Sequence, residues 1–375
     1  MTNTLIEKPI ISADSHVTEP ANIFDNRLPK KYQDVAPRMI RRPEGGDVFQ
    51  IPGMDNLYPI TLASAAGKRG KELADQVFAN FLDCHNGGWD PKQRLKDQDR
   101  DGIHGEVLYP SLGMYLSSHD DPQYKSAMFG AYNEWLAEYC ETAPDRLIGL
   151  GVTALESPEQ GIDDLKRMKA LGMRGVMMPG YPIMEDYHSR IYDPFWEAAV
   201  DLDLPLSFHI LTYKGNTGSD QARGPKLNQF IRIIRGNQDI IGMLIFGGVF
   251  ERFPDLKVVC AEADAGWVPH FMYRMDHAVE RSPHHLGDVT LSKKPSDYFK
   301  DNIYLTFQDD ITAFKFKDEM NVERMMWASD FPHLDSTYPH SQDLLAEHTA
   351  NLTPQERTMV LHDNVASLYK LAVHS

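Results

Sequence analysis

The chain has 375 residues, of which 42% are hydrophobic, and it carries a formal net charge of -16. This length and composition suit one large α/β domain with a substantial core. The acidic balance argues against a nucleic-acid partner and against anionic membrane surfaces. No apolar run approaches the ~20 residues that a membrane span needs. Three cysteines without CxxC spacing give no disulfide framework and no thiolate metal site. With no signal-peptide pattern at its start, a cytoplasmic location is the expectation.

The first expected strand, residues 9–13, leads into Asp14-Ser15-His16. In extended backbone Asp14 and His16 project to the same side, which allows both to bind one ion. Residues 19–90 then form a long segment with many prolines and scattered apolar side chains. We expect this insertion to pack over the mouth of the fold and to shape a substrate pocket, with Tyr58 and Trp89 among its apolar groups.

From residue 90 onward, short apolar runs alternate with helical patterns. The expected strands are residues 105–110, 147–153, 175–178, 204–210, 256–261, 303–307 and 324–328, and the expected helices are residues 91–101, 122–143, 157–171, 194–201, 227–253, 267–281 and 353–360. With the first strand this gives eight, and it predicts one (β/α)8 TIM barrel over residues 1–375, with the insertion between strands one and two. An open doubly wound sheet is the alternative, but neither a G-x-G-x-x-G after strand one nor a P-loop pattern supports a nucleotide-binding fold.

Polar side chains of the kind that bind metals stand where three expected strands end. Asp14 and His16 follow strand one, His209 ends strand five, and Asp330 follows strand eight within MMWASDFPH (residues 325–333). The C-terminal ends of barrel strands converge on the face where chemistry takes place. Two imidazoles and two carboxylates suit a divalent ion with a position open to water or substrate. We expect Zn2+ first, with Mn2+ and Fe2+ as alternatives.

Three further side chains near this face have several candidate roles. Glu262, after strand six, is a candidate ligand, a bridge to a second ion, a general base, or a carboxylate that orients a ligand imidazole. Asp264 is the candidate cap of the helix that starts near Trp267. His333 is expected to bind substrate or to orient Asp330.

At these residues the chain resembles the amidohydrolase superfamily, in the amidohydrolase-related branch that contains aminocarboxymuconate-semialdehyde decarboxylase and the hydroxybenzoate-type decarboxylases. The matching pieces occur in order over nearly the whole chain: ISADSH (11–16), the helix and strand of 95–110, 206–210, RFPDLKVV (252–259), GWVP (266–269), SDFPH (329–333) and DNVA (363–366). The resemblance implies a metal-dependent enzyme on a distorted (β/α)8 barrel. It also implies that the metal ligands are Asp14, His16, His209 and Asp330. A homo-oligomer is implied by family analogy alone.

The chain departs from the family pattern in two places. It carries D-x-H at the first pair, where the wider superfamily often has H-x-H. It carries Glu262-Ala263-Asp264 on strand six, where the decarboxylases usually have a His that acts as ligand or acid/base. A decarboxylation in this chain would therefore take its proton from a different group.

Three hypotheses for the function follow. The first is a metal-dependent enzyme that hydrolyses or decarboxylates a carboxylated small molecule, aromatic or hydrophobic, with Asp330 or Glu262 moving the proton. The second is an O2-dependent monooxygenase with two irons, motivated by the extra carboxylate of Glu262. The third is a non-catalytic protein that keeps its metal for structure. Lys214, Arg223 and Lys226, in the loop after strand five, are candidates to pair with a substrate carboxylate or a coenzyme A phosphate, or are solvated loop charges.

Overall fold

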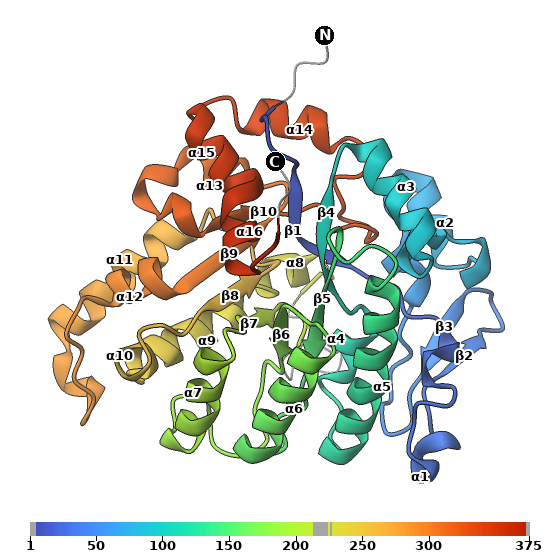
Figure 1. The fold of residues 1–375 in the computed structure, drawn as a ribbon, viewed down its shortest axis with the longest axis horizontal. Coiled ribbons are helices and arrows are strands. Elements are labelled where there is room, and N and C mark those ends of the chain that lie inside the picture. Colours follow the sequence, from blue (N-terminus) through green and yellow to red (C-terminus); the bar gives the residue numbers. More distant parts are fainter. Residues whose placement is uncertain (1–4, 213–223, 226, 373–375) are drawn as a thin grey trace.

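The computed structural model describes residues 5–212, 224–225 and 227–372. Within them, eight parallel strands follow one another around a barrel (Figure 1). In order around the ring they are β1 (Ile11–His16), β4 (Gly105–Tyr109), β5 (Leu147–Val152), β6 (Gly175–Met178), β7 (Leu206–His209), β8 (Val258–Ala261), β9 (Ile303–Phe307) and β10 (Met325–Trp327). The predicted (β/α)8 barrel and its eight strands are confirmed.

Every residue of these eight strands is buried. Strands covered on both faces are near-continuous apolar runs, which is why the sequence identifies them well. The main difference lies in β1, which begins later than predicted and continues through Asp14 and His16. Both residues therefore have strand geometry, and their side chains project toward the interior of the ring from one strand end.

Helices cover the outside of the barrel (Figure 1). The longer ones are α3 (Pro91–Asp101), α5 (Pro122–Cys140), α6 (Pro158–Ala170), α7 (Asp193–Asp201), α9 (Arg235–Phe246), α11 (Val268–Arg281), α12 (Pro295–Asn302) and α14 (Ser341–His348). The shorter ones are α1 (Lys30–Gln33), α2 (Gly70–Gln76), α4 (Leu112–Leu116), α8 (Asn228–Arg232), α10 (Val249–Arg252), α13 (Ile311–Lys315), α15 (Pro354–Thr358) and α16 (Asn364–Leu368). None of the helices in the described ranges combines the length and apolarity needed to cross a membrane.

The start of α3 matters for the site, and its sequence explains it. The Asp90 side chain accepts hydrogen bonds from the backbone N–H groups of Lys92 (2.9 Å) and Gln93 (3.3 Å), with Pro91 in the first turn. Gly102, at φ 70°, ends the helix in the left-handed conformation that glycine adopts freely. The Asp90 cap and Gly102 set where α3 begins and ends. Arg94, near the start of α3, contacts His16 at the end of β1 and Glu106 on β4.

The barrel closes between β1 and the loop after β10. Among the described residues, no regular β-ladder joins these two segments. Backbone N–H groups of Asp330 and His16 donate to the carbonyls of Asp14 (3.0 Å) and Phe331 (2.7 Å), respectively. The Ser12 hydroxyl accepts from the backbone N–H of Ser329 at 2.8 Å. We call this junction the seam. It joins the two chain segments that carry Asp14, His16 and Asp330.

The insertion contains an antiparallel hairpin of β2 (Arg38–Arg41) and β3 (Asp47–Gln50), which the sequence did not predict. It is drawn in blue at one side of the barrel in Figure 1. Two backbone hydrogen bonds of 2.9 Å between Phe49 and Tyr58 attach the following segment to β3. The backbone of Tyr58 is thus hydrogen-bonded to the hairpin and does not lie in a free loop.

Candidate metal centre

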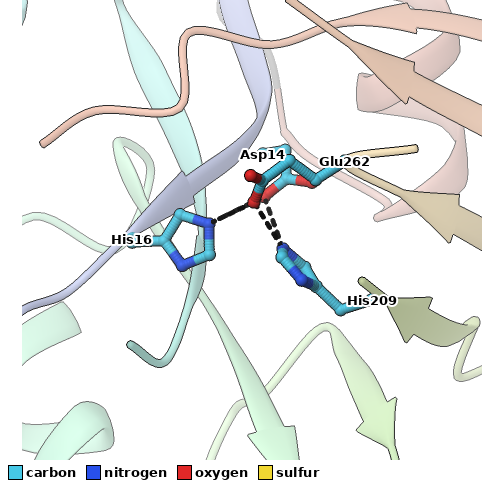
Figure 2. A group of neighbouring side chains, drawn as sticks. All are labelled: Asp14, His16, His209 and Glu262. Atoms are coloured by element: carbon cyan, nitrogen blue, oxygen red, sulfur yellow. Dashed lines mark hydrogen bonds and ion pairs between the residues drawn. The ribbon is translucent and has the colours of Figure 1, made fainter. Parts of the chain in front are cut away.

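Five predicted side chains meet at the C-terminal face of the barrel. Asp14 and His16 lie on β1, and His209 is the last residue of β7. Glu262 directly follows β8, and Asp330 lies three residues beyond the end of β10. Four of them are at most 1% exposed, and the Glu262 side chain is 12% exposed. Figure 2 shows the imidazoles of His16 and His209 directed toward the carboxylates of Asp14 and Glu262.

The donor atoms lie at spacings that suit a shared ion. His16 Nε2 is 3.5 Å from Asp14 Oδ1, 3.2 Å from Glu262 Oε2 and 3.3 Å from Asp330 Oδ1. His209 Nε2 is 3.6 Å from Asp14 Oδ1 and 3.1 Å from Glu262 Oε2. Neighbouring ligand atoms around an ion with bonds of ~2.1 Å are separated by about 3 Å or somewhat more. The donor set therefore has the dimensions of a coordination shell.

Both histidines are oriented by backbone carbonyls. His16 Nδ1 lies 3.0 Å from the Pro110 carbonyl oxygen, and His209 Nδ1 lies 3.0 Å from that of Ile210. A carbonyl only accepts, so each Nδ1 carries the hydrogen and each Nε2 can present a lone pair to the centre. This is the arrangement of metal-binding imidazoles.

Several buried polar atoms of the centre lack a hydrogen-bond partner among the described residues. They are Asp14 Oδ1, both carboxylate oxygens of Asp330 and His209 Nε2. Buried polar atoms without partners are rare and costly. A divalent cation would satisfy Asp14 Oδ1, His209 Nε2 and one oxygen of Asp330, and a donor set of imidazoles and carboxylates is chemically suited to such an ion.

The charges of the centre are strongly coupled. Burial, followed by the nearby charge of Glu262, raises the pKa of Asp330. Burial acts to raise the pKa of Glu262, but the contacts with His16 and His209 outweigh it and lower that pKa. For His209, burial acts to lower the pKa, but Asp14 and Glu262 outweigh it and raise it. In the metal-free protein His209 thus tends to hold a proton, which a bound cation would displace.

Two of the ligand-type residues have unusual backbone. Glu262 has φ 52° and Asp330 has φ 55°, in the left-handed region that side-chain-bearing residues rarely occupy. Each such residue costs on the order of 1 kcal/mol or more, and conformations of this kind concentrate at functional sites. The surrounding structure holds both carboxylates in place against this cost.

His333 lies directly beside the centre. Its ring stacks on that of His16, with centroids 3.8 Å apart and planes at 18°. Its Nδ1 is 3.2 Å from Asp330 Oδ1, and its Nε2 is 2.7 Å from the Ser111 hydroxyl. Burial lowers the pKa of His333 to about 4, so the ring is neutral near pH 7. This position is compatible with both predicted roles of His333, which are to orient Asp330 and to bind substrate.

Three supporting residues escaped the sequence analysis. Thr306 donates to Asp14 Oδ2 and accepts from the backbone N–H of Glu262, both at 2.8 Å. Ser111 contacts His333, and the buried Arg94 donates to the carbonyl oxygen of His16 at 2.6 Å. Thr306 and Ser111 lie at or just beyond strand ends, so the rule that singled out Asp330 could have found them. Arg94 lies in a charged helix, and nothing in the sequence distinguishes it from its exposed neighbours.

The predicted cap at Asp264 is wrong. The helix α11 has no side-chain cap from that residue; instead Asp310 Oδ2 accepts from the backbone N–H groups of Ala265 (2.8 Å) and Gly266 (2.7 Å). Asp310 comes from the next strand-end loop, which the sequence did not place beside this one. Lys214, Arg223 and Lys226 lie outside the described residues.

A cavity of about 550 Å3 opens directly onto the centre. Glu262, Asp330 and His333 line it, together with Tyr58 and Leu62 of the insertion. The other apolar side chains of its wall are Pro59, Ala63, Met114, Ile210, Leu211, Phe230, Ile233, Ile234 and Leu334, and its other polar residues are Asp264, Gln308, Asp309 and Asp335. A larger cavity of about 710 Å3 lies beside α9 and α11, and none of the predicted ligands lines it. The cavity next to the ligand-type side chains is therefore the smaller one, and its wall is partly acidic and partly apolar.

The fold is a (β/α)8 barrel with five ligand-type side chains at the C-terminal ends of its strands. The family model for amidohydrolases matches residues 82–371, and the chain belongs to that family. The resemblance inferred from the sequence motifs is confirmed.

Individual relatives agree with this assignment. The chain is 26% identical to a gamma-resorcylate decarboxylase of Rhodococcus jostii over 84% of its own length and 95% of the relative's. An amidohydrolase structure from Mycobacterium avium subsp. paratuberculosis superimposes with TM-score 0.80 at 19% identity, covering 97% of this chain and 100% of that one. A 5-carboxyvanillate decarboxylase of Novosphingobium aromaticivorans, solved with manganese, superimposes with TM-score 0.71 at 20% identity, covering 97% and 98%.

Proposed function

We propose that the protein is a metal-dependent decarboxylase that removes a carboxylate from an aromatic acid as CO2. The observation that carries the proposal is the convergence of five ligand-type side chains beside a cavity that Glu262 and Asp330 line and whose wall also carries apolar side chains of the insertion and of residues 230–234. Such a cavity orients a flat, carboxylated ring with its polar group at the ligands. The gamma-resorcylate and 5-carboxyvanillate decarboxylases support this choice among the chemistries of the family.

In this proposal Asp14, His16, His209, Glu262 and Asp330 hold one divalent ion. When bound, the ion supplies a Lewis acid that fixes and polarises a substrate oxygen. The bond between the ring carbon and the carboxylate breaks, the electron pair stays on the ring carbon, and that carbon takes up one proton as CO2 leaves. Asp330 Oδ1 and His333 Nδ1, 3.2 Å apart at the cavity wall, hold and deliver that proton. They take the place of the strand-six His that is absent here.

The identity of the ion is a separate question. Zn2+ is the first expectation from the sequence. Three carboxylates beside two imidazoles form an oxygen-rich set, which also suits Mn2+, the ion held by the N. aromaticivorans decarboxylase. Elemental mass spectrometry of protein purified without added metal distinguishes the two.

The two-iron monooxygenase remains the second candidate because of one observation. The donor atoms form two overlapping groups, Asp14-His16-His209-Glu262 and His16-Glu262-Asp330-His333. A pair of ions bridged by Glu262 would require close to two irons per chain and activity that stops without O2. The relatives favour decarboxylation over this alternative and over a non-catalytic role.

The decisive experiment measures the reaction and its proton together. Metal-free protein is reloaded with Mn2+ or Zn2+ and incubated in D2O with gamma-resorcylate, 5-carboxyvanillate and other hydroxybenzoates. We expect release of CO2 and one deuterium at the vacated ring carbon of the product. A chelator should abolish turnover, and the metal should restore it.

Two variants serve as a matched pair. His209→Ala removes an imidazole from the centre, and we expect metal content and turnover to be lost together. His188→Ala removes an exposed imidazole outside this cavity and should change neither. Hydrolysis products without CO2, or full turnover by His209→Ala, would contradict the proposal.

A further inference from the structure

The Ser111 hydroxyl lies at the meeting point of β1, the insertion and the loop after β10. Ser111 follows β4 directly before α4 and is completely buried. Its Oγ is 2.6 Å from the Val17 carbonyl oxygen and 2.7 Å from His333 Nε2. A hydroxyl group donates one hydrogen bond and can accept two.

The direction of each hydrogen bond follows from its partner. The Val17 carbonyl can only accept, so the single Ser111 proton lies on that bond. A lone pair of Ser111 Oγ then faces His333 Nε2, which must therefore carry a hydrogen.

The opposite tautomer of His333 is disfavoured by the same distances. If Nε2 were unprotonated, Ser111 would have to donate to it. The oxygens of Ser111 and Val17 would then face each other at 2.6 Å without a hydrogen between them, which is repulsive. A 180° flip of the ring would keep its stacking on His16 but would place carbon atoms where Nδ1 contacts Asp330 and Nε2 contacts Ser111, so both contacts would be lost.

Ser111 itself is held rigidly. The Glu19 carboxylate accepts from the backbone N–H groups of Ser111 (3.1 Å), Leu112 (2.8 Å) and Gly113 (3.1 Å). Glu19 is 1% exposed and anchors the turn that presents the hydroxyl. The position of the Ser111 oxygen is therefore set by the fold and not by His333.

We propose that Ser111 is a positioning residue that keeps a hydrogen on His333 Nε2 and so directs Nδ1 toward Asp330, whose Oδ1 is 3.2 Å away. The catalytic consequence rests on the proposed decarboxylation. The tautomer itself does not, so the two can fail separately.

The tautomer is measured by NMR in the metal-free protein. Histidine labelled with 15N in the ring reports whether each nitrogen carries a hydrogen, and the spectrum of His333→Gln identifies the His333 signals. In the unmodified chain we expect Nε2 protonated and Nδ1 unprotonated. Ser111→Ala should give a mixture of tautomers, and Ser111→Thr, which keeps the hydroxyl, should restore the original pattern.

A control variant removes a similar interaction outside the network. Ser117, on the same helical segment, is buried and donates to the Gly113 carbonyl at 3.1 Å. Ser117→Ala should leave the His333 signals unchanged. A His333 that carries its hydrogen on Nδ1 in the unmodified chain, or an unaltered His333 spectrum in Ser111→Ala, overturns the proposal.

Kinetics then test the catalytic consequence. Ser111→Ala should lower kcat by roughly ten- to a hundredfold, in the range found for outer groups that orient active-site imidazoles. Its KM and metal content should stay close to those of the unmodified chain, and Ser111→Thr should recover most of the activity. If the tautomer behaves as expected but no decarboxylation is found in any variant, the proposed function is wrong and the positioning role stands. A loss confined to KM contradicts a role of Ser111 that acts on turnover through His333.

Discussion

A single hydroxyl connects two candidate ligands from different strands. Thr306, on β9, donates to Asp14 Oδ2 and accepts from the backbone N–H of Glu262. The first bond leaves Asp14 Oδ1 for the ion, and the second supports Glu262 in its left-handed backbone. Thr306 thus determines which oxygen of Asp14 faces the centre.

We expect Thr306→Val to weaken metal binding by roughly ten- to a hundredfold, because valine keeps the shape and loses both hydrogen bonds. Thr306→Ser should retain most of the affinity. The measurement is a Mn2+ titration of metal-free protein, with free Mn2+ followed by electron paramagnetic resonance. Thr349→Val, which removes a buried threonine hydroxyl on α14's C-terminal side, is the control. Equal affinities in Thr306→Val and in the control would count against this role.

For single residues, the sequence predicts the ligand-type side chains better than the side chains that hold them in position. Asp14, His16, His209 and Asp330 could be singled out because an ionisable residue at the end of an apolar run has few structural explanations. Glu262 was found with its role open. Ser111 and Thr306 are small and common in loops and strands, and only the three-dimensional contacts reveal what their hydroxyls touch.

Helix α3 supports the centre from outside the barrel through Arg94. The guanidinium donates to the carbonyl oxygens of His16 (2.6 Å) and Phe331 (3.2 Å), and it forms an ion pair with Glu106 on β4. The Phe331 ring lies over it, 4.6 Å from Cζ to the centroid. One helix side chain thereby holds both sides of the seam.

Replacing Arg94 with methionine should destabilise the protein by about 3–5 kcal/mol, because Glu106 would remain buried without its partner. Arg94→Met combined with Glu106→Gln should regain part of that stability but not the metal affinity, since the His16 carbonyl stays without the hydrogen bond from Arg94. Denaturant unfolding in metal-free buffer and Mn2+ titration measure the two effects. Arg167→Met, on the exposed face of α6, is the control. Full recovery of metal binding in the double variant would show that only the charge of Arg94 matters.

The elements themselves were predicted with uneven success for a physical reason. The eight barrel strands are buried on both faces, so their apolar runs are unmistakable, and α3 is bracketed by Asp90-Pro91 and Gly102. Each strand of the β2–β3 hairpin has four residues, and the residues of β2 are exposed or half-exposed. Its pairing depends on packing within the insertion, which no local pattern records.

For the molecule as a whole, the seam is the place where the ring closes with the fewest backbone contacts. Asp14 and His16 lie on one side of it and Asp330 on the other, so an ion bound by all three would tie the ends of the sheet together. Ligand binding to the folded state stabilises it by about 2.7 kcal/mol at a hundredfold excess over Kd. Here that stabilisation should be concentrated at one junction.

Hydrogen exchange with and without metal tests this expectation. Removing the ion should accelerate amide exchange most in β1 and in residues 328–333, and least in β6 on the far side of the ring. His209→Ala, which weakens binding from outside the seam, should show the metal-free pattern even with metal present. A uniform change across all eight strands would indicate that the ion stabilises the barrel without tightening its closure.

The left-handed backbone at Glu262 and Asp330 has a consequence for how this chain can change over generations. Glycine would relieve the conformational cost at both positions, and asparagine would lessen it. Selection for folding alone would therefore move these two codons away from carboxylates, whereas selection for turnover would hold them. In a lineage that no longer needs the reaction, we expect Glu262 and Asp330 to be the first residues of the centre to be replaced, while the barrel fold is retained.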